Sequence, residues 1–205
     1  MWYLNFIILF YVLVILIQPS LQSNVTDDDT FPFRGLPVEQ FFKEGPVRKL
    51  QLTNMVWENC GRSNDPGRLY SLKIHHTPLG DINGVFKVGS VVKLISPVKL
   101  NLEVRLKTFG TYVKLPCFKN ILGSCTFPDV CKWGEQFQVC PFKPLRDAKF
   151  PCRCPIRKGI FQVSGEFPNP TTKYANSLTG DLSLTARLSY GGKHLSCYRF
   201  NVTLV

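Results

Sequence analysis

Cysteine and histidine are the residue types in this chain with the most chemistry to offer, and their positions decide which chemistry is open to it. The sequence holds eight cysteines and three histidines. Six of the cysteines crowd into residues 117–154, whereas Cys60 and Cys197 lie near the two ends of the apparent domain. Thiols in such numbers form disulfides in an oxidising compartment, and inside cells they bind metals or catalyse redox steps. The compartment therefore decides how the cysteines are interpreted.

The first 23 residues predict a secretory signal peptide. Residues 1–17 carry no charge and end in a long apolar run, and small polar residues follow at Ser20 and Ser23, near which cleavage is expected. An uncleaved signal anchor is the alternative, because no positive residue precedes the apolar run. Two glycosylation sequons, which begin at Asn24 and Asn201, fit the same route. We therefore expect a secreted or lysosomal glycoprotein whose cysteines form disulfides.

Spacing narrows the disulfide pairing without fixing it. Cys152 and Cys154 are separated by one residue, so in an extended chain they point to one face and are poorly placed to bond each other. A zinc site that uses both is the minor alternative. The pairings that spacing favours are Cys117 with Cys125 over a small loop at Gly123, Cys131 and Cys140 with Cys152 and Cys154 in either order, and Cys60 with Cys197. Eight cysteines allow about 105 pairings in all, so this choice is an inference.

The histidines do not match a catalytic set. Ribonucleases of the pancreatic type are also small, basic, secreted and rich in cysteine, but their chemistry needs two histidines that converge on one phosphate. His75 and His76 are adjacent and would face opposite sides of a strand, and none of that family's motifs surrounds them or His194. We therefore expect no catalytic residues, no metal site, no cofactor and no nucleic-acid partner.

The chain that positions these residues divides into three parts: a signal peptide at 1–23, an N-terminal arm or pro-segment at 24–52, and a domain at 53–205. The arm contains turn residues and no sustained periodicity. Its Arg48-Lys49 pair is either a processing site or an ordinary solvated basic pair. About 180 residues remain after cleavage, enough for one domain with its own core.

Alternation of apolar and polar residues predicts strands in the domain. The expected strands cover residues 70–74, 85–94, 100–106, 112–115, 160–167, 182–188 and 198–204. Turn signals at Asn83-Gly84, Phe109-Gly110 and Gly191-Gly192 lie between them. Only residues 129–137 look able to form a brief helix. Short strands at this spacing indicate an all-β fold, either a β-sandwich or a small barrel.

Seven short blocks of the domain carry a further pattern. They are Trp57-Glu58-Asn59-Cys60, Ser96-Pro97-Val98-Lys99, Leu115-Pro116-Cys117, Gly123-Ser124-Cys125-Thr126-Phe127, Pro144-Leu145-Arg146, Pro151-Cys152-Arg153-Cys154-Pro155 and Gly192-Lys193-His194-Leu195-Ser196-Cys197. In order and spacing they resemble the landmarks of the ML lipid-recognition family, and within it those of the lysosomal cofactors of β-hexosaminidase. The resemblance runs from about Trp57 to Val205.

The resemblance implies an immunoglobulin-like β-sandwich whose sheets splay apart into a cup for lipid tails. It implies the disulfides Cys60–Cys197, Cys117–Cys125, Cys131–Cys154 and Cys140–Cys152. It also implies a non-enzymatic function, in which the protein lifts a ganglioside-type glycosphingolipid from a membrane and presents it to a soluble glycosidase. A carrier of a sterol or phospholipid, or a lipid-binding defence protein, is the alternative on the same scaffold.

The apolar rows of the expected strands are candidate walls of the lipid cavity, although an ordinary packed core would show the same rows. These residues are Val88, Val92, Leu94, Leu100, Leu102, Val104, Leu106, Leu182, Leu184 and Leu188. For membrane docking, the resemblance implies tryptophans at the place of Tyr112 and close to Asn176. Tyr112 keeps an aromatic ring that suits the membrane interface, whereas Asn176 does not, and Tyr174 and Leu178 are its nearest substitutes. The net charge of +11 favours anionic membranes.

Overall fold

The computed structural model describes residues 45–49, 51–76, 82–120, 122–135, 137–167, 171–172 and 175–205. The strands are β1 (Arg48–Lys49), β2 (Leu52–Asn59), β3 (Gly67–His76), β4 (Ile82–Ser90), β5 (Val98–Thr108), β6 (Thr111–Lys114), β7 (Thr126–Phe127), β8 (Gly159–Phe167), β9 (Thr171–Thr172), β10 (Gly180–Tyr190) and β11 (Lys193–Leu204). The helices are α2 (Cys131–Glu135), α3 (Lys143–Asp147) and α4 (Ala175–Leu178). No helix in these ranges is long and apolar enough to cross a bilayer. The expected signal peptide and Asn24 lie outside the described residues.

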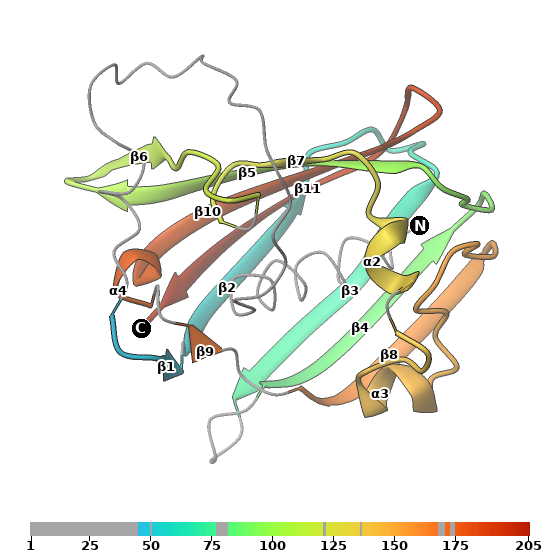
Figure 1. Cartoon of the computed structure of the whole chain (residues 1–205), viewed down its shortest axis with the longest axis horizontal. Helices are drawn as coiled ribbons and strands as arrows, with labels where there is room; N and C mark the ends of the chain where they lie inside the picture. The colour runs from blue at the N-terminus through green and yellow to red at the C-terminus, as the bar shows by residue number, and fades with distance from the viewer. Residues whose placement is uncertain are drawn as a thin grey trace.

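Two antiparallel sheets form the body of the protein, which confirms the predicted all-β sandwich. The larger sheet has the strand order β2-β11-β10-β5-β6, with β7 also paired to β5, and the smaller sheet has the order β3-β4-β8. A separate pair, β1 with β9, lies beside them. Strands of both sheets run along the same diagonal of the molecule, and β2 and β3 are the sheet edges nearest its middle (Figure 1).

The expected strands of the larger sheet are present because their alternation matches the pleat. Residues 100–106 and 182–188 pair with each other in β5 and β10, and residues 198–204 pair with β10 in β11. The turns at Phe109-Gly110 and Gly191-Gly192 are both two-residue hairpin loops, and all four residues have a positive φ. Such φ values define the type I′ turn that fits the twist of a hairpin.

Sequence reasoning missed β2 as a strand, and a bulge explains why. In the pairing with β11, Leu52 is opposite Leu204, Met55 is opposite Val202, and the register shifts between the two pairs. The inward residues of β2 are therefore three apart and then two apart, and the alternation on which a strand prediction depends is broken. Leu52, which the sequence division placed in the arm, is the first residue of β2 and is buried.

Three other expectations need correction. The turn expected at Asn83-Gly84 does not form, because both residues lie inside β4. The strand expected at 85–94 ends at Ser90, whose hydroxyl donates to the carbonyl of Val92 and turns the chain out of the sheet. Leu94 then forms an isolated bridge with Ile156. The helix expected within 129–137 is present as α2, but it is not the only helix, because α3 and α4 also form. These last two have five and four residues, too few for a helical period to appear in the sequence.

The four disulfides are the pairs that the family resemblance implies: Cys60–Cys197, Cys117–Cys125, Cys131–Cys154 and Cys140–Cys152. The loop closed by Cys117 and Cys125 requires a glycine at position 123. Gly123 has a φ of 82°, and a Cβ there would lie 1.8 Å from the carbonyl oxygen of Pro116. The bridge between Cys60 and Cys197 spans 137 residues and joins the end of β2 to β11.

Candidate lipid-binding seam

The clearest opening in the sandwich lies between the facing edges of its two sheets. β2 pairs only with β11 and β3 only with β4, so each strand has one unpaired edge among the described residues. A cavity of about 310 Å³ separates these edges, and we call it the seam. Its lining residues are Leu52, Thr53, Asn54 and Met55 of β2, and Leu72, Lys73, Ile74 and His75 of β3.

The seam has an apolar side and a polar side because consecutive residues of a strand point to opposite faces. Leu52 and Leu72 are buried in the core, and Met55 and Ile74 are half-buried against it. Lys73 and His75, by contrast, are exposed. The backbone edges of β2 and β3, each unpaired with another strand among the described residues, lie between these sides. This arrangement suits a ligand with an apolar tail and a polar head.

Apolar rows connect the seam to the residues expected to form the cavity walls. Across the inner face of the larger sheet, Met55 is opposite Val202, which is opposite Leu182, which is opposite Leu106. The next row runs from Trp57 through Phe200 and Leu184 to Val104 in the same way. The expected wall residues of β5 and β10 therefore lie on one face, and that face ends at the seam.

All ten expected wall residues lie in or against one apolar core. Eight of them are buried members of the cluster, and Val92 and Leu106 are partly buried against it. None of the ten lines the seam cavity itself. The ten expected wall residues therefore lie in or against the core, and the sequence analysis missed Met55 and the neighbouring residues of β2 that border the cavity. The broken alternation of β2 is the reason, since it hid the strand although the block from Trp57 to Cys60 placed that segment in the domain.

Beyond one end of the seam, the chain crosses from β2 to β3. The Cys60–Cys197 disulfide lies there, and the Cys60 amide donates to the carbonyl of Cys197. Nearby, Nδ1 of His194 lies 3.2 Å from a carboxylate oxygen of Asp65, which is buried. Burial, and then the negative charge of Asp65, raise the pKa of the Tyr198 hydroxyl. The contact between His194 and Asp65 thus links β11 to the segment that connects β2 with β3.

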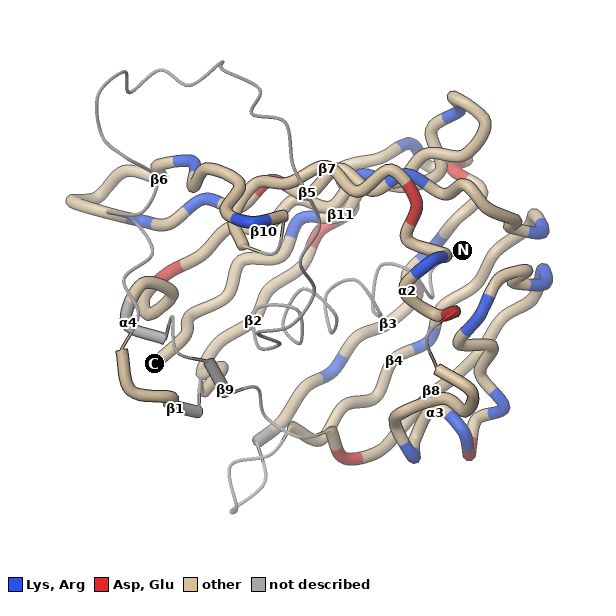
Figure 2. Tube along the Cα trace, in the orientation of Figure 1, with Lys and Arg blue, Asp and Glu red and all other residues tan. Residues whose placement is uncertain are grey.

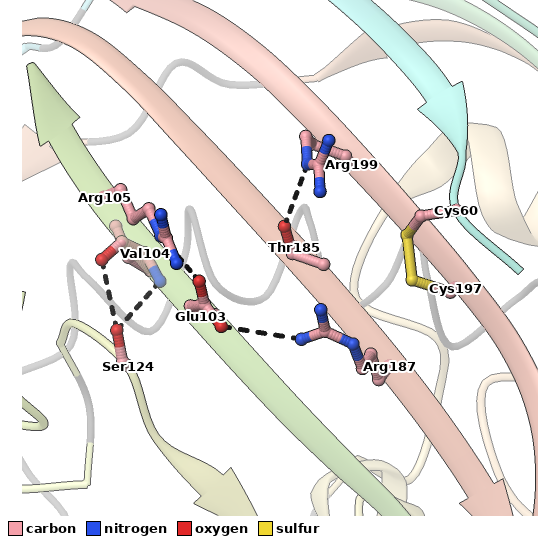
Figure 3. Close-up of polar contacts among 9 residues, drawn as sticks. All are labelled: Cys60, Glu103, Val104, Arg105, Ser124, Thr185, Arg187, Cys197 and Arg199. Atoms are coloured by element: carbon pink, nitrogen blue, oxygen red, sulfur yellow. Dashed lines mark hydrogen bonds and ion pairs between the residues drawn. A yellow bond between two sulfur atoms is a disulfide. The ribbon is translucent and has the colours of Figure 1, made fainter. Parts of the chain in front are cut away.

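Charged side chains on the outer face of the larger sheet contact one another (Figure 3). Glu103 contacts Arg105 at 2.6 Å and Arg187 at 3.6 Å, and Arg199 reaches Glu58 at 2.7 Å and Thr185 at 3.4 Å. Burial alone would raise the pKa of the Glu103 carboxyl, but the Arg105 hydrogen bond and the surrounding positive charges outweigh it and hold that pKa below its usual range. The carboxylates of Glu58 and Glu103 on this sheet are therefore each paired with arginine.

The hairpin between β5 and β6 carries the most exposed aromatic residue in the described chain. Phe109 occupies the turn with a φ of 49°, and its side chain is fully open to solvent. Tyr112, an expected docking residue, follows on β6 and is 44% exposed. Sequence reasoning identified Phe109-Gly110 only as a turn. The signal it passed over is that a large apolar residue stands where such turns favour Asn, Asp or Gly.

The other two expected docking residues have different outcomes. Leu178 ends α4 with only 1% of its surface exposed and belongs to the core, so its side chain is not on a docking edge. A leucine in a short helix packs inward when the helix lies against apolar sheet residues. Tyr174 lies outside the described residues. The aromatic edge at this hairpin therefore consists of Phe109 and Tyr112.

The described residues do not gather a group of three or more His, Cys, Asp or Glu side chains that would hold a metal ion. The cysteines among them are all in disulfides. His75 is exposed on β3 of the smaller sheet. His194 lies on β11 of the larger sheet and contacts the carboxylate of Asp65. The features that stand out as a candidate site are therefore the amphipathic seam, the apolar rows behind it and the aromatic hairpin.

These features and the sequence define the class of protein. Residues 54–204 match the model of the ML domain, and the chain belongs to the ML domain family. It is a lipid-binding protein of that family, related to the proteins named ganglioside GM2 activator. The mouse ganglioside GM2 activator is 32% identical over 168 residues, which cover 78% of this chain and 86% of the relative. The protein of the same name from Macaca fascicularis is 33% identical over 164 residues, which cover 75% and 85%.

Two solved structures also match. Chicken MD-1 complexed with lipid IVa has a TM-score of 0.31 and 14% identity, with 75% of this chain and 96% of the other covered. A Niemann-Pick type C2 protein from the Japanese carpenter ant has a TM-score of 0.29 and 14% identity, with 78% and 96% covered.

Proposed function

We propose that this protein is a non-enzymatic lipid carrier that lifts a glycosphingolipid of the ganglioside type out of a membrane and presents it to a soluble glycosidase. The observation that carries the proposal is the seam, an opening about 310 Å³ in volume with an apolar side continuous with the core and a polar side at the surface. Ligand cavities in proteins occupy roughly 300–1,000 Å³, so the seam is at the small end of that range. The relationship to ganglioside GM2 activators supports the choice of lipid.

The energetics of extraction explain why such a carrier needs apolar rows behind the opening. Exposing a lipid tail to water costs about 0.8 kcal/mol per CH₂, or on the order of 12 kcal/mol for a tail of about 16 carbons. A carrier must replace the bilayer with a surface that is equally dry. The inner faces of β5, β10 and β11 offer such a surface, and their rows end at Met55 on the edge of the seam. Parting β2 from β3 gives a tail access to these rows.

Membrane docking fits the hairpin between β5 and β6. Phe109 is fully exposed at its tip, and Tyr112 lies beside Lys107, its partner in the strand pairing. Aromatic rings favour the membrane interface, and basic residues near them are attracted to anionic lipid headgroups. We propose that this hairpin inserts into anionic membranes. Equal binding to neutral and anionic vesicles at low salt would contradict the electrostatic part of the proposal.

A secretory and lysosomal route is part of the same proposal. The four disulfides fit an oxidising compartment. Asn201, one of the two candidate glycosylation sites, is exposed on the outer face of β11, and Thr203 of its sequon donates a hydrogen bond to Asp181. A glycan there would lie on the face away from the core. Glycosidase treatment of the secreted protein, followed by mass measurement, tests this site and Asn24.

A matched pair of substitutions tests the seam. Met55 points toward the core and borders the seam, whereas its neighbour Val56 is exposed on the outer face. We expect Met55→Trp to fill the opening and lower the uptake of a fluorescent ganglioside from vesicles. Val56→Trp adds the same bulk outside and should leave uptake unchanged. Equal uptake by the two variants, with equal thermal stability, would refute the seam as the entry.

Native mass spectrometry of the protein purified from its source identifies the ligand. A bound glycosphingolipid is the expected result. A sterol or phospholipid in its place would assign the protein to the alternative carriers on the same scaffold. The absence of any bound lipid under gentle conditions, together with no uptake in the vesicle assay, would refute the carrier function.

A further inference from the structure

The outer face of the smaller sheet differs from that of the larger sheet in how its charges are paired. β3 and β4 contain no Asp or Glu, and the single acidic residue of β8 is Glu166, near the strand's end. Lys73 and Lys87 are exposed on this face, and neither contacts a carboxylate among the described residues. On the larger sheet, by contrast, Glu103 is paired with two arginines. The basic charge of the smaller sheet is therefore uncompensated.

Apolar side chains are exposed at one corner of the same face. Tyr70 is 46% exposed and Ile160 is 57% exposed. The two lie over Gly89, because a Cβ at that glycine would be 3.0 Å from Cγ1 of Ile160 and 3.1 Å from Cε2 of Tyr70. The exposed Val91 follows at the end of β4, two residues after Gly89. Exposed apolar side chains that lie together among cations favour an interaction site.

Cations surround this apolar corner. The ammonium group of Lys87 lies 5.9 Å from the centre of the Tyr70 ring. Arg68 is opposite Gly89 in the strand pairing, and Lys158 directly precedes β8. Both are exposed. We define the Tyr70 face as Tyr70, Val91 and Ile160 together with Arg68, Lys87 and Lys158. Lys and Arg segments gather at this end of the smaller sheet in Figure 2.

We infer that the Tyr70 face is a protein-docking surface, and that the partner is a soluble protein with carboxylates around an apolar centre. An apolar core with a charged rim is the usual anatomy of protein interfaces, and tyrosine is enriched at their hot spots. A sulfated polysaccharide would match the cations but would offer Ile160 and Val91 no apolar surface to contact. Charge complementarity and the apolar corner together therefore select an acidic protein.

The position of the face favours a protein over a bilayer. Tyr70 and Ile160 lie near the starts of β3 and β8, at the opposite end of the molecule from the β5–β6 hairpin (Figure 1). A carrier that docks on a membrane through Phe109 keeps this face turned toward the solution. A soluble enzyme then has access to the carrier and its lipid together. The choice of a glycosidase as partner rests on the proposed function.

The experiment measures enzyme binding and lipid extraction separately, with the full disulfide-bonded protein and a soluble β-hexosaminidase as probe. The test variants are Lys87→Glu/Lys158→Glu and Ile160→Asp. The control is Lys99→Glu/Lys193→Glu, which makes the same change in net charge at two exposed lysines of the larger sheet. Enzyme binding is measured without lipid at low ionic strength, and extraction is measured from ganglioside vesicles without enzyme.

We expect both test variants to weaken enzyme binding at least about tenfold, because reversed rim charges and a buried carboxylate each oppose association. Lipid extraction by the test variants should stay within about twofold of extraction by the unmodified protein. For the control variant, both enzyme binding and extraction should stay within the same limit. Unchanged enzyme binding in the test variants, or an equal loss in the control, overturns the inference. A loss of extraction with no loss of enzyme binding would also overturn it and would assign the face to the membrane. Wild-type protein that binds the enzyme but extracts no lipid would refute the carrier function alone.

Discussion

Replacing Phe109 by asparagine separates membrane docking from folding more cleanly than any other change in this protein. The side chain is fully exposed at the hairpin tip, so its removal takes nothing from the core. Its backbone is left-handed, with a φ of 49°, and this conformation costs most residues on the order of 1 kcal/mol but is tolerated by asparagine. An Asn-Gly pair is the preferred sequence of a type I′ turn. Phe109→Asn should therefore leave the melting temperature unchanged or raise it.

The expected loss appears only at the membrane. Moving a phenylalanine side chain from water into an apolar environment is worth about 1.5–3 kcal/mol. If Phe109 inserts on docking, the variant should partition onto anionic vesicles about 10- to 150-fold more weakly. Vesicle sedimentation at several lipid concentrations measures the partition coefficient, and calorimetry of the free protein measures stability.

The control is Val139→Asn, which removes another exposed apolar side chain, from the disulfide-linked region between α2 and α3. It should leave partitioning unchanged. Normal partitioning of Phe109→Asn would refute the docking role of the hairpin. A loss confined to Val139→Asn would move the docking edge to the disulfide-linked region.

Four further substitutions test other parts of the structure. Tyr112→Ala should slow ganglioside extraction from vesicles with little change in thermal stability, since the ring is only partly covered; a large drop in melting temperature would show that the ring belongs to the core. Glu103→Gln should destabilise the protein above about pH 4.3, the usual pKa of an unfolded glutamate. The folded pKa is lowered, so this contribution is lost as pH falls through it, and denaturation of both proteins between pH 7 and pH 3 should show a narrowing gap. Replacing Cys60 and Cys197 by alanine should reduce the free energy of unfolding by about 5 kcal/mol in the chain-entropy model, as urea titration would measure, and a loss below about 1 kcal/mol would contradict that model. Gly123→Ala should lower secreted yield, because its Cβ would overlap the Pro116 carbonyl oxygen; normal yield and melting temperature would show that the loop rearranges freely.

Alternation in the sequence was sufficient to predict the strands that form the centre of the larger sheet. β5 buries one face and exposes most of the other, and β10 keeps the same alternation of apolar and polar residue types although Thr185 is buried, so every second residue marks the face toward the core. The edge strand β2 has most of its residues exposed and contains a bulge, and both effects remove the signal. The disulfide pairing of Cys152 and Cys154 likewise depends on how the chain folds back, which spacing does not contain.

The site was predictable only in part, for a related reason. The core residues that we propose as walls could be named because most of them belong to regular strands. The seam could not, because it depends on Leu52 and Leu72 coming to opposite sides of a gap between different sheets. The Tyr70 face depends in the same way on pairing across three strands, which brings Tyr70 and Ile160 together over Gly89.

The Cys60–Cys197 disulfide makes one end of β2 a fixed point about which the edge of the seam would rotate. Cys60 and Cys197 fix the end of β2 where the chain passes to the smaller sheet, while the seam cavity borders the other end of that strand. β2 has eight residues, which makes an arm about 25 Å long. β2 is paired with β11 along its whole length, so a rotation of about 10° about this pivot would carry the edge of the larger sheet with it and displace the start of β2 by about 4 Å, close to the contact distance between two carbon atoms. A small rotation of this sheet edge would therefore widen the seam by about the distance that a hydrocarbon chain needs.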